Sequence, residues 1–186
     1  MQDYTSKRKQ IMKQILLVLA LVALLGPAAP RADGAGIAAV AVGRPIPTFT
    51  YRLLGGARLD TARLRGHRYM LWVMATWCPS CVTGAHVLAR HNAQLRRSGF
   101  RIVQLEAAGD LGYPGPSLAS IRSGVGLSST APNWYWGILT EAQSLALDPA
   151  SAPDVFYLVD RHGRVRAQSS APAAHWAQIS AFAAGH

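Results

Sequence analysis

Two cysteines, Cys78 and Cys81, are the only ones in the chain, and two residues separate them. Thiols with this spacing can form and break an internal disulfide and so pass two electrons to or from another molecule. The loop between them is too short to restrict an unfolded chain much, which argues against a structural staple. A small scaffold held by disulfides would also need more cysteines, placed farther apart. The pair therefore predicts a redox-active dithiol.

The residues around the pair predict which thiol attacks. Tyr69–Ala75 is a nearly continuous apolar run, which indicates a strand buried on both faces and central in a mixed or parallel sheet. Pro79 then favours the first turn of a helix, because its missing N–H would have had no partner there. A helix start stabilises a thiolate. Cys78 is thus predicted to attack, and Cys81, one helical turn later, to resolve the mixed disulfide.

The pattern after the cysteines predicts a strand–helix–strand unit. An apolar stripe that begins at Val82 indicates a helix that ends at Gly99, and Phe100–Leu105 indicates the next strand. Residues 107–117 are expected to be irregular, and the aromatic run Trp134–Trp136 is expected to be core rather than a partner surface. The other expected elements are a hairpin of Phe49–Leu54 with Ala57–Leu59, a helical turn at residues 60–64, helices at Leu118–Arg122, Ile138–Leu147 and Ala173–Ala184, and a hairpin of Asp154–Val159 with Val165–Ala167.

A metal site is the main alternative for the two cysteines. They have the spacing of half a zinc knuckle, and His86 and His91 follow them. On a helix, however, His86 would lie about 140° around the axis from Cys81, and there is no second cysteine pair. The sequence therefore predicts no zinc site, and both histidines are expected on the helix surface. Binding of Cu(I) by the two thiols remains an alternative.

The first 47 residues differ from the rest. A basic start that includes Lys7 and Lys13 precedes the apolar run Ile15–Leu25, and Gly, Pro and small residues follow. This order predicts an export signal or a retained membrane anchor over residues 1–30, because the run is shorter than the 20 or so residues of a comfortable membrane span. Residues 31–47, rich in Ala and Gly, are predicted to be a flexible tether, and residues 48–186 a single domain. Most of the chain should therefore lie outside the cytoplasm.

The formal charge of +10 does not predict nucleic-acid binding. Part of it belongs to the basic start of the signal, and the remaining Arg residues are scattered without interleaved aromatic side chains. The one local group is Arg58, Arg63, Arg65 and Arg68. A solvated basic face, near a bilayer or an acidic partner, is the better interpretation.

The motifs resemble a known family. The stretch Ala75–Cys81 (ATWCPSC) and the later Ala152–Val165 (APDVFYLVDRHGRV) are similar to the extracytoplasmic, membrane-anchored or periplasmic thioredoxin-like proteins of bacteria. That group contains the cytochrome c maturation thioredoxins and related reductases. The resemblance spans about residues 46–167, and its further matching positions are Pro47–Phe49, Gly56, Leu59 and Leu64–Gly66.

The resemblance implies an α/β thioredoxin-like fold, with a central mixed sheet flanked by helices and an N-terminal β-hairpin extension. It implies that Pro153 is cis and faces the cysteines, and that a client docks against the backbone of Ala152. It further implies no cofactor beyond the Cys78–Cys81 disulfide. The residues it assigns to client docking are Trp77, Pro79, Ser80, Ala152 and Pro153.

The chain departs from the family at three positions. Thioredoxin has a buried acid six residues before the first cysteine, where this chain has Trp72, so proton transfer to and from Cys81 must use water or another group. Relatives often have Glu and Pro shortly after the second cysteine, where this chain has Gly84 and His86.

Together these observations favour an exported thiol–disulfide oxidoreductase that reduces disulfides of client proteins. Its electrons would have to come from a membrane donor, since the chain has no third cysteine and the compartment is oxidising. Two alternatives stay open at this point. The same dithiol could oxidise or isomerise client thiols, or the chain could be a non-enzymatic Cu(I) metallochaperone.

Overall fold

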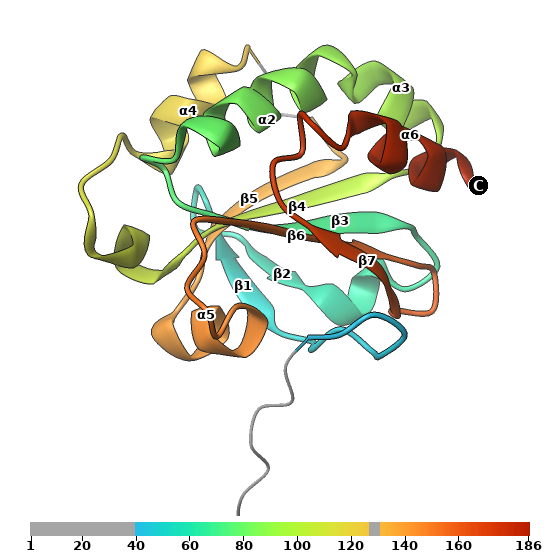
Figure 1. Ribbon diagram of the computed structural model, residues 1–186, viewed down its shortest axis with the longest axis horizontal. Coiled ribbons are helices and arrows are strands. Elements are labelled where there is room, and N and C mark those ends of the chain that lie inside the picture. Colours follow the sequence, from blue (N-terminus) through green and yellow to red (C-terminus); the bar gives the residue numbers. More distant parts are fainter. Residues whose placement is uncertain (1–39, 127–130) are drawn as a thin grey trace, which may run out of the picture. The chain divides into compact units, whose positions relative to one another are not determined.

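Seven strands form one mixed sheet in the computed structural model, which describes residues 40–126 and 131–186 (Figure 1). The strand order is β2-β1-β5-β4-β3-β6-β7. Strands β3, β4 and β5 run parallel, and every other neighbouring pair is antiparallel. The strands are β1 (Thr50–Leu53), β2 (Arg58–Asp60), β3 (Tyr69–Met74), β4 (Arg101–Glu106), β5 (Trp134–Ile138), β6 (Asp154–Val159) and β7 (Val165–Ser169).

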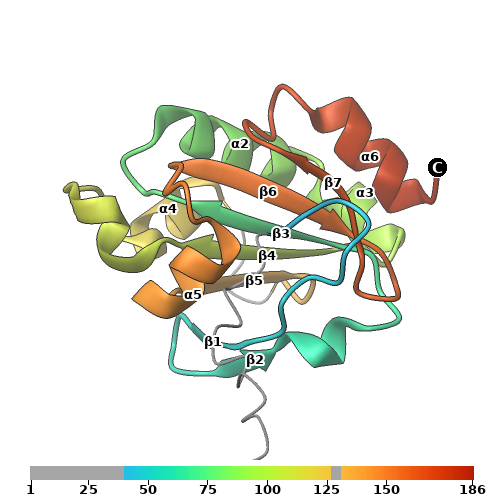
Figure 2. The ribbon, with the colours of Figure 1, turned by 60° about the horizontal axis from the view of Figure 1, so that its bottom comes forward.

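Helices cover both faces of this sheet. The core on one face contains side chains of α2, α3, α4 and α6, and the core on the other contains side chains of η1, α5 and the β1–β2 hairpin (Figure 1). Figure 2 shows this hairpin extending the sheet beyond β5, which confirms the predicted N-terminal extension. The helices are η1 (Thr61–Leu64), α2 (Pro79–Arg90), α3 (Asn92–Arg97), η2 (Ala108–Gly112), α4 (Leu118–Gly124), α5 (Glu141–Leu147) and α6 (Trp176–Ala184).

Strand β3 lies at the centre of the fold, between β4 and β6, as its apolar sequence predicted. All six of its residues are buried, since side chains alternate between the two faces and both faces are covered. Met70, Trp72 and Met74 belong to the core beneath α2, whereas Leu71 and Val73 belong to the opposite core. The residues that follow β3 are therefore held at a rigid edge of the sheet.

The helix predicted to run to Gly99 is in fact two helices, so that prediction is partly wrong. Helix α2 ends at Arg90 and α3 begins at Asn92, with His91 between them in a non-helical conformation. The His91 ring stacks on Trp176, the first residue of α6, at 4.2 Å, and Leu95 of α3 is 1% exposed. The break therefore lies at a residue that packs against α6, a contact that the apolar pattern did not reveal.

The aromatic run is a strand, β5, that the sequence did not predict. Trp134 and Trp136 lie on the same face, stacked at 5.2 Å, and both are buried as expected. The Trp134 indole donates to Gln104 Oε1 at 3.1 Å. The helix predicted from Ile138 starts only at Glu141, because Ile138 pairs with Arg52 and Glu106 in the sheet.

The end of the predicted tether packs on the domain. Gly43 N donates to Val165 O at 2.7 Å, and Ile46 N donates to Gly163 O at 2.9 Å. Val40 and Ile46 are buried in the core that contains η1 and α5. Apolar burial and backbone pairing thus hold residues 40–47 of the predicted tether against the domain.

The predicted signal or anchor, residues 1–30, and residues 31–39 lie outside the described residues. Among the helices in the described part of the chain, none has the length and apolar character needed to cross a membrane.

Candidate functional site

The two cysteines lie where β3 ends and α2 begins, as predicted. Cys78 is the N-cap residue of α2, Pro79 is its first residue, and Cys81 lies in the first turn. Both are free thiols in this structure. Cys78 is 4% exposed and Cys81 is fully buried. Both thiols are therefore buried, and Cys78, which is predicted to attack, is slightly more exposed than Cys81.

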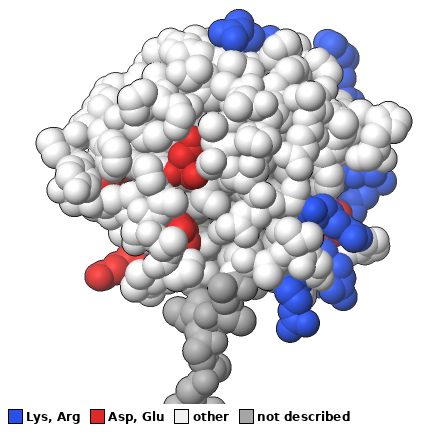
Figure 3. Space-filling model, viewed as in Figure 1, with Lys and Arg blue, Asp and Glu red and all other residues white. Residues whose placement is uncertain are grey.

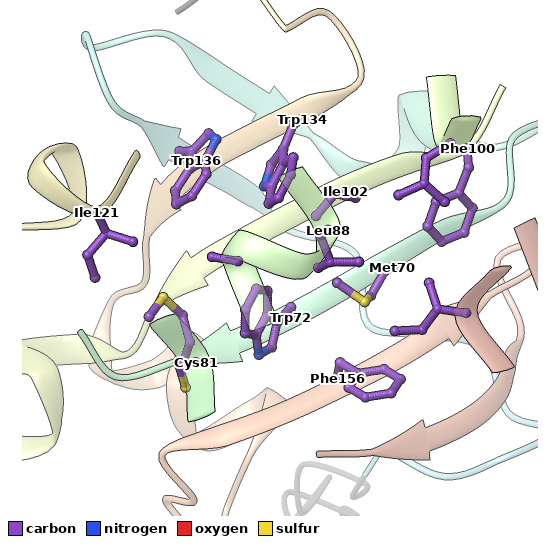
Figure 4. Packing of buried hydrophobic residues seen from close by; sticks show 14 of the residues in the cluster. Met70, Trp72, Cys81, Leu88, Phe100, Ile102, Ile121, Trp134, Trp136 and Phe156 are labelled. Atoms are coloured by element: carbon purple, nitrogen blue, oxygen red, sulfur yellow. The ribbon is translucent and has the colours of Figure 1, made fainter. Parts of the chain in front are cut away.

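Cys81 is held inside the core. Its thiol donates to the Pro153 carbonyl oxygen at 3.0 Å, and its side chain packs in the same cluster as Trp72 and Leu88 (Figure 4). Burial raises the pKa of Cys81 well above its ordinary value, and the contact with Cys78 and the charge of Asp154 act in the same direction. Cys81 therefore remains a neutral thiol in the resting site, and its attack requires a proton acceptor.

Pro153 faces the cysteines, but its peptide bond is trans. None of the described residues has a cis peptide bond, so the cis prediction is wrong. The trans form is intrinsically favoured by about 0.5–1 kcal/mol, and the chain turns instead at Ser151, whose φ is 52°. The Pro153 carbonyl still joins the site to the sheet, because it accepts from Ala75 N at 2.9 Å as well as from Cys81.

The carboxylate of Asp154 is the main feature that sequence reasoning missed. Its Oδ1 accepts from the Trp72 indole at 2.8 Å, and its Oδ2 accepts from the Ser80 hydroxyl at 2.7 Å and from Ala171 N at 3.1 Å. Ser80 Oγ also lies 3.1 Å from Cys78 Sγ. The site thus contains a buried acid although β3 has Trp72 at the position where thioredoxin has one. This acid, Asp154, comes from β6, and Trp72 helps to position it.

Asp154 could be seen in the sequence, but its place in the site could not be predicted without the register of β3 and β6. Asp154 lies opposite Met74 in the antiparallel pair of β3 and β6, directly before the cysteine loop. Its place immediately after Pro153 in the sequence was visible, yet nothing in the sequence alone aligned the two strands.

A second missed acid, Asp110, holds the residues before Cys78. Its two carboxylate oxygens accept from the backbone N–H and the hydroxyl of Thr76, the first at 2.6 Å, and its carbonyl accepts from the Trp77 indole at 2.8 Å. Asp110 and Leu111 both have positive φ, 53° and 59°, a region that Asp tolerates better than Leu. The contacts to Thr76 and Trp77 stabilise this strained turn.

A groove of about 580 Å³ opens beside the cysteines. Tyr113 is 64% exposed and lies edge-on to Trp77 at 5.2 Å, and Leu145 is 47% exposed. Large apolar side chains this exposed suit contact with another molecule. The residues that line the groove are Trp77, Ala108, Gly109, Leu111, Tyr113, Glu141, Ser144, Leu145, Ser151 and Pro153.

The docking residues implied by the resemblance meet only in part. Trp77 and Pro153 line the groove, while Pro79 and Ser80 are exposed at the start of α2 and Ala152 is half-buried. Ser80 is oriented towards Cys78 and Asp154 by its hydrogen bonds.

Charge is unevenly distributed over the surface. On the face drawn in Figure 3, most acidic side chains lie in the left half, whereas basic side chains lie along the right and upper edges. In Figure 1 the left half of the same view contains α5 and the start of α2. The redox site therefore lies on the less basic side of a basic protein. At the end of β4, burial and then the charge of Asp110 raise the pKa of Glu106.

The same side chains include a potential set of metal ligands. Ligand atoms of Cys78, Cys81 and Asp154 all lie within 4.8 Å of one another. Two thiolates suit a soft ion such as Cu(I). His86 is exposed on α2 and His91 stacks on Trp176, so neither histidine adds to this set.

A CxxC pair at the start of the helix after a central strand, facing a proline-led strand, defines a thioredoxin-like thiol–disulfide oxidoreductase. The chain is 31% identical over 155 residues to the thiol:disulfide interchange protein DsbE of Yersinia pestis, covering 82% of this chain and 76% of that protein. It therefore belongs to the DsbE family of thiol:disulfide interchange proteins. No family model matches the chain.

Solved structures support the fold. A thioredoxin-family thiol:disulfide interchange protein from Chlorobium tepidum superposes with a TM-score of 0.59 at 20% identity, over 78% of this chain and all of the other. A secreted Mycobacterium tuberculosis disulfide oxidoreductase homologous to E. coli DsbE superposes with a TM-score of 0.57 at 23% identity, over 74% of this chain and 96% of the other. The predicted thioredoxin-like fold is confirmed.

The raised pKa of Cys81 predicts a specific loss of stability in alkali. In the unfolded chain Cys81 ionises near its ordinary value of 9.0, but in the folded protein it stays protonated, so rising pH favours unfolding. Between about pH 8 and 10 the reduced wild-type protein should lose about 1 kcal/mol more unfolding free energy than the Cys81→Ser variant. Urea unfolding with a reducing agent measures this difference. Tyr51 and Tyr69, whose pKa values burial also raises, are present in both proteins and cancel. Equal losses in the two proteins would contradict the assignment.

Proposed function

We propose that this chain reduces disulfides of exported client proteins, with Cys78 as the attacking thiol and Cys81 as the resolving thiol. The observation that carries this proposal is the difference between the two sulfurs. Cys78 lies at the N-terminus of α2 beside the groove, while Cys81 is fully buried and bonded to Pro153. Cys78 is therefore the better placed of the two buried cysteines to meet a large substrate.

The reaction proceeds in two exchanges. The Cys78 thiolate attacks one sulfur of the client disulfide, forms a mixed disulfide and releases the other client sulfur as a thiolate, which takes up a proton. Cys81 then loses its proton and attacks Cys78 Sγ, which breaks the mixed disulfide and releases the second client thiol. The client gains two electrons and two protons, and the enzyme is left with a Cys78–Cys81 disulfide.

The surroundings of the sulfurs favour the reducing direction. A strong dithiol oxidant has a reduced form stabilised by a low-pKa thiolate. Here burial and the nearby Asp154 carboxylate keep Cys81 protonated, and none of the hydrogen bonds of the described residues joins a cationic side chain to either sulfur. Cys81 thus adds no thiolate stabilisation to the reduced form, which favours release of its electrons.

The groove beside Cys78 is the proposed docking site for the client chain. A client segment would lie over Trp77 and Pro153 and against the backbone of Ala152, with Pro79 and Ser80 beside the reacting sulfur. Tyr113 and Leu145 add apolar surface to the groove.

The proposed location is outside the cytoplasm, at the outer face of the cytoplasmic membrane or free in the periplasm. It is supported by the basic and apolar pattern of residues 1–30 and by the secreted relative. A reductase in an oxidising compartment must be reduced again, so a membrane electron donor is the proposed partner. The Cys78–Cys81 pair supplies the chemistry without a further cofactor.

The direction of electron flow is tested by the reduction potential. We expect a value well below about −200 mV from equilibration with glutathione or thioredoxin, together with reduction of insulin by the reduced protein. A value near about −120 mV, the range of a strong oxidant, would show the opposite polarity.

The order of attack is tested by trapping. In cells that express the Cys81→Ser variant, mixed disulfides through Cys78 should accumulate, because the second exchange cannot take place. The Cys78→Ser variant should trap none, since Cys81 has no exposed surface and its thiol is bonded to the Pro153 carbonyl. Non-reducing electrophoresis and mass spectrometry would identify the trapped clients, and equal trapping by the two variants would overturn the assigned roles.

The docking site is tested by Tyr113→Ala. Loss of this exposed ring should raise KM for a protein client about five- to tenfold, the effect of about 1 kcal/mol of apolar contact, and change the rate with a small disulfide much less. Val42→Ala removes another exposed apolar side chain that does not line the groove and is the control. A similar change in KM for both variants would place docking elsewhere.

A further inference from the structure

A second groove, of about 430 Å³, lies at the end of the sheet opposite the cysteines. The basic side chains that line it are Arg68, which directly precedes β3, Arg161 and His162 of the β6–β7 turn, and Arg166 of β7. Cys78 comes after the other end of β3, so the six residues of that strand, about 20 Å of extended chain, separate the two places. This basic groove is thus distinct from the redox site.

One carboxylate side chain, Asp160, lines the basic groove, and its bonds are already made. Its oxygens accept from two backbone N–H groups of the β6–β7 turn and from Arg166 Nε, the last at 2.7 Å. The pair of Arg166 with Asp160 is the one ion pair among residues 40–126 and 131–186. Within those ranges Arg68 and Arg161 therefore have no carboxylate partner.

The positive charges around the basic groove lie close enough together to act on one another. The residue before Arg68 is His67, whose Nε2 accepts from the Arg101 guanidinium at 2.9 Å. Burial, and then the charges of Arg101 and Arg161, lower the pKa of His67. Figure 3 shows basic side chains along the right edge, where Figure 1 has the β6–β7 turn and the end of α6. An anion at this end of the sheet would meet several unpaired cations at once.

The described chain begins beside the same end of the sheet. The guanidinium of Arg164, in the β6–β7 turn, donates to Gly43 O at 3.2 Å. The predicted export signal or anchor, residues 1–30, precedes this point in the sequence. Residues 31–39 separate that segment from the described domain, and nine residues span at most about 30 Å. A membrane that holds residues 1–30 therefore lies within reach of the basic groove.

We propose that the basic groove and the β6–β7 turn form a docking surface for the anionic phospholipid headgroups of a membrane. Arg68 and Arg161 bind headgroup phosphates, because a guanidinium matches phosphate oxygens in geometry as well as in charge. Each arginine near an anionic membrane surface favours binding, and attachment through a short tether makes even a weak contact effective. A membrane is favoured over an acidic protein because the chain enters the domain at this surface from the predicted anchor.

Docking through this surface sets the orientation of the domain. The membrane would lie at the end of the sheet where β3 begins, and Cys78 lies beyond the end where β3 finishes. The groove beside Cys78 is then directed away from the lipid and stays open to clients. This consequence rests on the proposed function and location, whereas the lipid contact itself does not depend on redox activity.

Hydrogen exchange of the reduced, full-length protein on lipid vesicles tests the docking surface. On vesicles of phosphatidylcholine with about 30% phosphatidylglycerol, peptides that cover the β6–β7 turn should exchange about fivefold more slowly than on pure phosphatidylcholine. Peptides that cover β1 and β2 should exchange equally on both. Because attachment through residues 1–30 is open to both kinds of vesicle, the difference reports the contact of the domain. Salt at about 0.5 M should remove most of it by screening.

Two variants with the same loss of charge separate this surface from general attraction. Arg68→Gln with Arg161→Gln should abolish the difference between the two kinds of vesicle. Arg52→Gln with Arg58→Gln removes two exposed arginines paired across β1 and β2, near the opposite edge of the sheet, and should leave it unchanged. Arg161 is exposed, so Arg161→Gln alone should fold even if the first double variant does not, and it should remove most of the difference.

Equal exchange of the β6–β7 turn on the two kinds of vesicle would overturn the proposal, as would equal effects of the two double variants. Slower exchange in millimolar inorganic phosphate without vesicles, to the same extent as on the anionic vesicles, would show a site for a small anion and reject the lipid surface. Insulin reduction is measured on the same samples. Its loss with the lipid effect intact rejects the proposed function alone, and the reverse result rejects the docking surface alone.

Discussion

The carboxylate of Asp154 is the interaction on which the geometry of the site depends. It joins three separate parts of the chain: the central strand through Trp72, the start of α2 through Ser80, and the turn before α6 through Ala171. A buried carboxylate is costly unless it is well bonded, and these three donors satisfy it. The cysteine loop is thus fixed by hydrogen bonds to a buried carboxylate as well as by packing.

Those parts of the site that depend on local sequence were predictable. The apolar run of β3 and the proline at the start of α2 placed Cys78 and Cys81 correctly, because strand burial and helix initiation are set by neighbouring residues. Asp154 and Asp110 were not predictable, since each reaches the site from another segment. Their positions depend on strand register and on a strained turn, which leave no periodic pattern in the sequence.

The same distinction explains the errors in the fold. The break at His91 depends on a stack with Trp176, and the strand β5 depends on pairing with two other strands. The peptide before Pro153 was assigned by resemblance and is trans, and the backbone two residues earlier, at Ser151, has a positive φ. The first two errors concern contacts between segments distant in sequence, where tertiary packing overrides local preference.

The Pro153 carbonyl gives the two redox states different local bonding. In the reduced protein it accepts from both Ala75 N and the Cys81 thiol. Formation of the Cys78–Cys81 disulfide removes the thiol proton, so the carbonyl keeps one donor and loses the other. The backbone at Pro153, part of the proposed docking site, is therefore held by one hydrogen bond fewer after electron transfer than before it. On the proposed function, the surface that a client contacts changes its bonding in the same step that completes the reduction of the client.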